Sequence, residues 1–176
     1  MRQCTKSARM PVRSAKTKAI ATAVSRAIAA YKDREGERWT AIEPEEWMRE
    51  RAEQRLKPHI QLRAGVAESL PFEDGSLDWA LCTLVLCSVQ QPERSLQELR
   101  RVLKPQGELL FLEHVRGQGW KGRLHDWCTP WWSWLVHGCH LNRATGDALQ
   151  RQFVVEEVER LEIASVPFVF GRARPR

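Results

Sequence analysis

The chain has 176 residues, 43% of them apolar, and a mean hydropathy of −0.48, values typical of one soluble domain with a buried core. The first 32 residues hold eight Lys or Arg and no acid, and the remainder holds 20 basic and 22 acidic side chains, so the net charge of +6 belongs to the N-terminal segment. Nucleic-acid binding by the near-neutral remainder gains no support, and we find no signal-peptide or membrane-spanning stretch. Five irregularly spaced cysteines indicate reduced thiols and a cytoplasmic protein.

The N-terminal segment, residues 1–37, begins with a polar, basic stretch whose composition indicates disorder. Apolar side chains then recur at helical spacing from Ile20 to Tyr31, which predicts an amphipathic helix over Thr17–Lys32. An Arg-rich and Ser-rich segment without acids is also typical of an organelle transit peptide. We favour an unstructured to helical leader and assign residues 38–176 to the folded domain.

A strand, a helix and a second strand open this domain, over Arg38–Ile42, Glu45–Leu56 and Ile60–Arg63. Glu43 follows the first strand directly. An acidic residue at the carboxyl end of a strand in a doubly wound sheet is well placed to accept hydrogen bonds from ribose hydroxyls. From the residues alone, however, a solvated surface glutamate is the better interpretation.

The strongest pattern in the chain is a strand, a helix and a strand after a polar turn. The apolar run Leu77–Cys87 predicts a strand buried on both faces, and Pro92 opens an amphipathic helix. The segment Lys104–Gly107 ends that helix and permits a reversal into the strand Leu109–Leu112, which is followed by Glu113 and His114. This βαβ unit predicts a parallel sheet.

Five tryptophans lie between Trp120 and Trp134. Thr129 as N-cap and Pro130 at the first helical position predict a short helix that ends at Gly138. Trp127, Trp131 and Trp134 would share one side of it. That side could pack into the core or line a pocket for an apolar substrate. Contact with a membrane is a third alternative, which we rank below these two.

The same region is rich in possible zinc ligands, but their spacing matches no regular zinc pattern, so we predict no metal site. The ligands considered are His125, Cys128, His137, Cys139 and His140. Further on, Asn142–Phe153 is predicted as a helix. Val154–Ile163 and Val166–Gly171 are predicted as an antiparallel pair of closing strands.

Three stretches carry a family resemblance: Gly65–Phe72 (GVAESLPF), Ser76–Asp78 (SLD) and Arg100–Gly107 (RRVLKPQG). In this order they resemble the second half of a class I S-adenosylmethionine-dependent methyltransferase domain of the type-11 kind. The resemblance covers roughly residues 39–176. It implies a Rossmann-like α/β fold and S-adenosylmethionine as the cofactor.

The resemblance also implies site residues. Glu43 matches the acid that binds the ribose. Val66 stands where the family commonly has an acid for the adenine amino group, and it could only pack on the ring. The remaining candidates are Ala67 and Glu68 through backbone contacts to adenine, Thr83 and Leu84 beside the methionine portion, and His114 as a base. For His114 we favour the alternative, a structural hydrogen bond to a neighbouring loop.

The family's glycine-rich turn is absent, since Gly36 is the only glycine before Glu43. We therefore expect an incomplete sheet without its first strand, which normally lies between the second and the fourth. The expected function is methyl transfer to a small, apolar acceptor such as a lipid, a quinone-like molecule or a small thiol. Whether the truncated cofactor motif leaves the protein inactive stays open at this point. The alternative is a non-catalytic protein whose Trp-rich face, Trp120–Trp134, meets a membrane or a protein partner.

Overall fold

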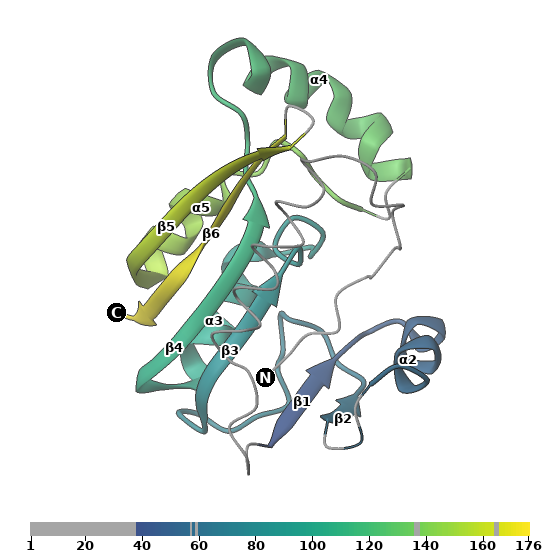
Figure 1. Cartoon of the computed structure of the whole chain (residues 1–176), viewed down its shortest axis with the longest axis vertical. Coiled ribbons are helices and arrows are strands. Elements are labelled where there is room, and N and C mark those ends of the chain that lie inside the picture. Colours follow the sequence, from purple (N-terminus) through teal and green to yellow (C-terminus); the bar gives the residue numbers. More distant parts are fainter. Residues whose placement is uncertain (1–37, 57, 59, 136–137, 164–165) are drawn as a thin grey trace.

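The structure, a computed structural model, describes residues 38–56, 58, 60–135, 138–163 and 166–176 (Figure 1). The helix predicted over residues 17–32 and the transit-peptide alternative lie outside these residues. The domain boundary at residue 38 therefore stays a prediction.

The first part of the described chain is a two-stranded parallel sheet. Strand β1 (Trp39–Ile42) pairs with β2 (Ile60–Arg63), and helix α2 (Glu46–Glu53) connects them, ending three residues earlier than predicted. Trp39 and Ile42 are buried, and Ile42 joins the main hydrophobic core. The strand–helix–strand prediction is confirmed.

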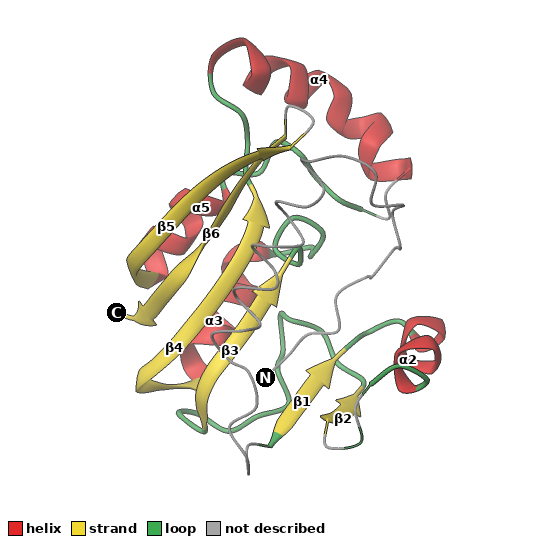
Figure 2. Cartoon of the chain, viewed as in Figure 1, coloured by secondary structure: helices red, strands yellow, loops and turns green. Residues whose placement is uncertain are grey.

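A four-stranded sheet in the order β3-β4-β6-β5 forms the larger part of the fold (Figure 2). Strands β3 (Leu77–Thr83) and β4 (Leu103–His114) are parallel and joined by helix α3 (Pro92–Val102). Strands β5 (Phe153–Ile163) and β6 (Val166–Pro175) are antiparallel, and β6 lies against β4. The predicted crossover and closing pair are thus confirmed, giving a mixed, Rossmann-like sheet.

No strand ladder joins β1 to β3 within the described ranges, although their Trp39 and Trp79 rings meet edge to face with centroids 3.7 Å apart. The gap falls where the sequence predicts that the first strand of the family is missing. Because residues 1–37 are not described, the absence of that strand stays a prediction.

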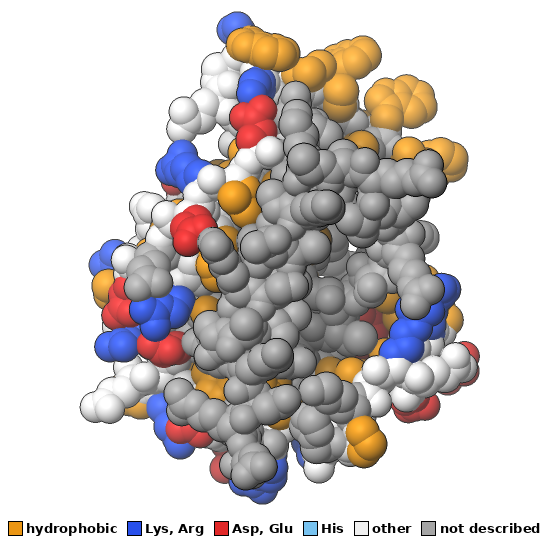
Figure 3. Space-filling view, viewed as in Figure 1, with side chains coloured by type: hydrophobic (Ala, Val, Ile, Leu, Met, Phe, Trp, Pro, Cys, Tyr) orange, Lys and Arg blue, Asp and Glu red, His pale blue; other side chains and the backbone are white. Residues whose placement is uncertain are grey.

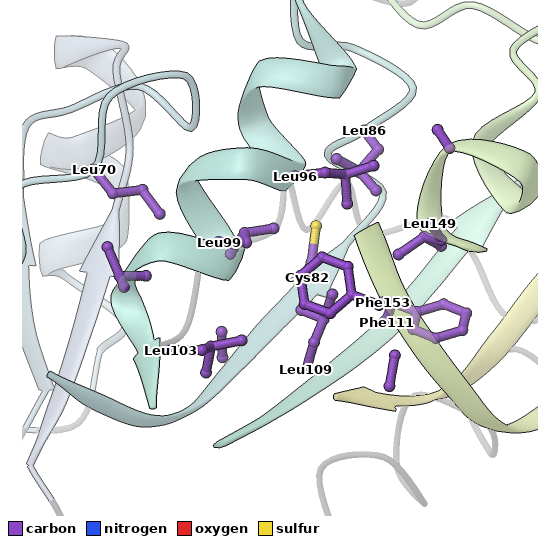
Figure 4. Packing of buried hydrophobic residues seen from close by; sticks show 14 of the residues in the cluster. Leu70, Cys82, Leu86, Leu96, Leu99, Leu103, Leu109, Phe111, Leu149 and Phe153 are labelled. Atoms are coloured by element: carbon purple, nitrogen blue, oxygen red, sulfur yellow. The ribbon is translucent and has the colours of Figure 1, made fainter. Parts of the chain in front are cut away.

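The core lies between the four-stranded sheet and two helices, α3 and α5 (Thr145–Gln152) (Figure 4). Leu96 and Leu99 of α3 face Leu109 and Phe111 of β4, with Leu149 of α5 beside them. Helix α5 begins three residues later than predicted. The periodic leucines of α3 therefore bury the face that the sequence indicates.

The apolar run after residue 77 is only partly a strand. Strand β3 ends at Thr83, and Leu84 adopts a positive φ of 53°. Leu86 and Cys87 nevertheless stay buried in the loop that follows. The reason is the buried carboxylate of Glu113, whose Oε1 accepts hydrogen bonds from the backbone N–H groups of Val85 and Leu86 at 2.8 and 3.2 Å.

The junction of α3 and β4 also differs from the prediction. The helix ends at Val102, but Leu103 already pairs with Leu77, and the next partners are Glu108 and Trp79, so residues 104–107 bulge out of the ladder. A Cβ on Gly107 would lie 3.0–3.1 Å from three backbone carbonyl oxygens. Glycine is required there by close approach rather than by a reversal of the chain.

Helix α4 (Gly119–Leu135) begins ten residues before the predicted N-cap. The Thr129 hydroxyl donates to the carbonyl oxygen of His125 at 2.6 Å, one turn earlier, and Pro130 lies inside the helix. The described helix ends at Leu135, and residues 136–137 are not described, so the predicted end at Gly138 stays a prediction; Gly138 itself has a φ of 80°, and its N–H donates to the Ser133 carbonyl. The Thr-Pro pair was misleading because a threonine hydroxyl can also bond to its own helix.

Candidate functional site

The carboxyl ends of β1, β3 and β4 point the same way, toward the end of the molecule where α4 lies (Figure 1). This edge therefore carries Glu43 after β1, Thr83 at the end of β3 with Leu84 after it, and His114 at the end of β4. Ligands of open α/β sheets bind outside this edge. The fold thus brings most of the predicted site residues to one end.

Glu43 is buried and held by its neighbours. Its Oε1 accepts a hydrogen bond from the Glu45 N–H at 3.1 Å, and Arg49 donates to the carbonyl oxygens of Glu43 and Pro44. In the described part of the chain no donor meets Oε2. The carboxylate is therefore positioned rather than solvated, in contrast to the interpretation from the residues alone.

The three residues of the loop from Val66 to Glu68 have different surroundings. Val66 is exposed and Ala67 is buried. The Glu68 Oε1 accepts hydrogen bonds from the backbone N–H groups of Gln90 and Gln91, at 2.8 and 3.1 Å, and so fastens the loop to the start of α3. The side chain of Glu68 is structural, and a contact to adenine would have to use the backbone.

Thr83 and Leu84 form an unusual end to β3. The Thr83 hydroxyl is buried and finds no hydrogen-bond partner among the described residues. Leu84 donates its N–H to the Leu112 carbonyl. Its positive φ is a strained backbone conformation, and its apolar side chain is exposed at the edge of the sheet. Such strain is common at ligand sites.

His114 lies with two cysteines that the sequence does not place near it. Its Nε2 is 2.9 Å from the Sγ of Cys139, and that sulfur is 3.8 Å from the Sγ of Cys87. The hydrogen bond with Cys87 and the nearby His114 lower the pKa of Cys139 to about 4. The same pairing and burial raise the pKa of Cys87.

The ligands considered for zinc do not gather as a set. His125 accepts a hydrogen bond from the Gly117 N–H through Nδ1, and His140 bonds to the Gly138 carbonyl. His137 is not described. Of the described ligands considered, Cys139 alone joins a cluster, with Cys87 and His114. Sequence reasoning missed Cys87 because it counted as part of an apolar strand.

The tryptophans of α4 face solvent. Trp127, Trp131 and Trp134 are 74%, 77% and 83% exposed, and Trp120 and Leu135 are exposed beside them. Figure 3 shows these hydrophobic side chains gathered over α4 at one end of the molecule. The prediction that they share a side is confirmed, and core packing is wrong for them.

The fold and this edge define a class I methyltransferase domain. Residues 20–111, more than half of the chain, match the family model described as "Methyltransferase domain", so the chain belongs to that family. The thiol S-methyltransferase TMT1B of Homo sapiens is 46% identical over 90 residues, which are 49% of this chain and 37% of that protein. The match thus spans little more than a third of this relative.

Other similarities agree with the fold. A ubiquinone/menaquinone biosynthesis C-methyltransferase of Methylobacterium nodulans is 45% identical over 80 residues, 44% of this chain and 31% of that protein. A SAM-dependent methyltransferase structure from Thermotoga maritima, titled a possible histamine N-methyltransferase, is 27% identical, with a TM-score of 0.57 over 78% of this chain and 73% of that one. A Pyrococcus horikoshii protein, 14% identical, shows the same fold with a TM-score of 0.60 over 95% and 94% of the two chains.

The cofactor that this family implies is S-adenosylmethionine, and the described residues fit it in two respects. The buried Glu43 carboxylate retains an oxygen for ribose hydroxyls, and the buried, unpartnered hydroxyl of Thr83 suits the polar methionine end. The position of a glycine-rich turn falls before β1, outside the described residues.

Proposed function

We propose that this chain is the cofactor-binding and acceptor-binding part of an S-adenosylmethionine-dependent methyltransferase that acts on a small, apolar thiol. The observation that carries the proposal is the pair of Glu43 and Thr83 at the carboxyl edge of a methyltransferase-family sheet. Thiol is chosen among the acceptors because the human relative is a thiol S-methyltransferase.

In this proposal the side chains at the edge mainly hold and orient. The cofactor supplies a methyl group on a sulfonium, and in-line displacement needs the acceptor sulfur close and aligned. Glu43 accepts hydrogen bonds from the ribose, Val66 packs on the adenine ring, and the backbone of Ala67 and Glu68 lies beside it. Thr83 and Leu84 border the methionine portion.

The base role predicted for His114 stays a prediction. Its Nε2 meets Cys139, which leaves that nitrogen engaged within the protein. The geometry favours His114 as a residue that positions the Cys139 sulfur, at the same edge as the proposed cofactor site.

The experiment is calorimetric titration of the full chain with S-adenosylhomocysteine. Glu43→Ala should weaken binding by about 1–3 kcal/mol, because ribose hydroxyls would lose a charged acceptor. Glu46→Ala, an exposed acid on α2, is the matched control and should bind like the wild type. Equal affinity of both variants would mean that the ribose site lies elsewhere.

A second candidate function follows from the exposed tryptophans of α4: contact with a membrane surface or an apolar partner. None of the described helices combines the length and the apolar character needed to cross a bilayer, so such contact would be peripheral. We propose that the protein is cytoplasmic and touches a membrane surface or an apolar partner through these tryptophans. Targeting to an organelle is the alternative.

Liposome flotation tests the second candidate. Trp127→Gln with Trp131→Gln should abolish flotation and leave the melting temperature nearly unchanged, because both side chains are exposed. Strong flotation by a wild-type chain with no affinity for S-adenosylhomocysteine would favour a non-catalytic interaction protein over the enzyme.

A further inference from the structure

Three side chains from separate parts of the chain converge just beyond the carboxyl end of β4. Cys87 comes from the loop after β3, His114 ends β4, and Cys139 follows α4. Their Sγ, Nε2 or Nδ1 and Sγ atoms all lie within 4.8 Å of one another. Across the described ranges no other three His, Cys, Asp or Glu side chains come close enough to share a metal ion.

The distance between the two sulfurs agrees with a tetrahedral zinc site. Two thiolates at a Zn–S length of about 2.3 Å stand about 3.8 Å apart in a tetrahedron. The Sγ atoms of Cys87 and Cys139 are 3.8 Å apart. The imidazole needs a small movement: its Nε2 is 2.9 Å from the Cys139 sulfur, whereas zinc would hold the two atoms about 3.6 Å apart.

Among the described residues the cluster offers three ligands, the number that catalytic zinc takes. Structural zinc takes four protein ligands, whereas catalytic zinc takes three and leaves one position open. Cys87 and His114 are buried, and Cys139 is partly exposed. The Trp132 side chain of α4 contributes to the lowered pKa of Cys139, so the apolar helix adjoins the cluster.

We propose that Cys87 Sγ, His114 Nε2 and Cys139 Sγ bind a zinc ion whose fourth position takes the sulfur of the acceptor thiol. The proposal rests on the proposed function for the identity of that fourth ligand. The acceptor releases its S–H proton to solvent and binds as a thiolate, a form that zinc favours. The methyl group then leaves the sulfonium, forming the new S–CH₃ bond and leaving neutral S-adenosylhomocysteine. The thioether product is a weaker ligand and departs.

The test uses the full chain, purified under reducing conditions and dialysed against zinc, with the metal measured by mass spectrometry. We expect about one zinc per chain. Cys139→Ser should lower zinc affinity by more than the roughly 100-fold that loss of an outer-shell partner causes. Cys128→Ser, a partly buried cysteine of α4 outside the cluster, is the control and should keep the metal.

Cobalt substitution reports on the fourth position without any assay of methyl transfer. Wild-type chain loaded with Co²⁺ should show sulfur-to-cobalt charge-transfer absorption that increases when benzyl mercaptan is added. Cys87→Ala, checked for folding by circular dichroism, provides a second variant in case Cys139→Ser does not fold. Calorimetry with S-adenosylhomocysteine on the same samples tests the proposed function separately.

Each result decides the proposal. Absence of zinc from the wild type, isolation of Cys87 and Cys139 as a disulfide, or equal zinc affinity in Cys139→Ser and Cys128→Ser would overturn the metal site. Bound cobalt whose absorption spectrum does not change on addition of benzyl mercaptan would overturn the proposal that the fourth position is open. Zinc binding with a mercaptan response but no S-adenosylhomocysteine affinity would retain the site and reject the methyltransferase function.

Discussion

Glu98 and Arg101, one turn apart on α3, tie the loop before β3 to the helix. The Glu98 Oε2 accepts a hydrogen bond from the Leu70 N–H at 2.8 Å, and Arg101 donates to Glu98 and to the carbonyl oxygens of Leu70 and Phe72. The loop carries Val66 and Glu68 at its start. Leu70, Phe72 and Arg101 lie in the stretches that carry the family resemblance. Their contacts hold in place the loop that carries a proposed cofactor contact.

This network predicts a stability change with pH. The hydrogen bond from Arg101 lowers the pKa of Glu98, so the folded state keeps the carboxylate ionised. Its stabilisation is present above the unfolded pKa of about 4.3 and is lost as the pH falls through the lower folded value. Glu98→Gln should cost about 1–2 kcal/mol at pH 7, with a smaller cost near pH 3.

Urea denaturation at both pH values measures the change, with the exposed Glu50→Gln on α2 as control. A gap between wild type and Glu98→Gln that stays constant from pH 7 to 3 would show that the carboxylate's charge contributes nothing.

Replacing Thr83 should change the stability of the fold and the affinity for the cofactor product in opposite directions. Its buried hydroxyl has no partner among the described residues, and leaving such a group unpaired costs about 1–3 kcal/mol. Thr83→Val keeps the shape and removes the hydroxyl, so the free energy of unfolding should rise by about 1 kcal/mol. Affinity for S-adenosylhomocysteine should fall if the hydroxyl meets the cofactor. A variant that is destabilised would mean that the hydroxyl is already hydrogen-bonded in solution.

At the scale of elements, the sequence predicts best where a pattern is local. The leucines of α3 and the alternation of the closing strands depend on neighbours a few residues away, and both predictions are confirmed. The end of β3 was wrong because Glu113, about 30 residues further on, supplies the acceptor that the loop needs. The cluster of Cys87, His114 and Cys139 was missed for the same reason: only the fold makes them neighbours.

The bulge between α3 and β4 predicts a loss of stability when Gly107 is replaced. A methyl group on Gly107 would press on the carbonyl oxygens of Leu77, Asp78 and Lys104, so Gly107→Ala should destabilise the fold by about 1–3 kcal/mol. Gly146→Ala is the matched control: its Cβ would meet no atom within 4 Å on α5, and it should stabilise by about 0.5–1 kcal/mol. Thermal melts compare the two, and equal melting temperatures would contradict the close approach.

The whole molecule combines two sheets of different strength. Strand β4 lies between β3 and β6, whereas β1 and β2 are four residues each and pair only with one another in the described part of the chain. Two-stranded sheets are marginal on their own. We therefore expect the amides of residues 109–114 to exchange at least about tenfold more slowly than those of 60–63, a difference of about 1.4 kcal/mol.

Hydrogen exchange with mass spectrometry measures both peptides in one sample. Equal protection would show that β1 and β2 are held to the larger unit by contacts other than a strand ladder. The Trp39–Trp79 contact is then the first place to test, because it joins β1 to β3 without a ladder.

The position of β6 sets the order in which the chain can mature. Residues 168–173 pair with Leu109–His114 on one side, and the same strand pairs with β5 on the other, with a bulge between Val155 and Glu157. While the ribosome is still making residues 166–175, β5 has no place in the sheet and one edge of β4 is bare. Completion of the sheet must therefore follow synthesis of β6, and a nascent chain paused before residue 166 would offer that bare edge to chaperones or to a second nascent copy.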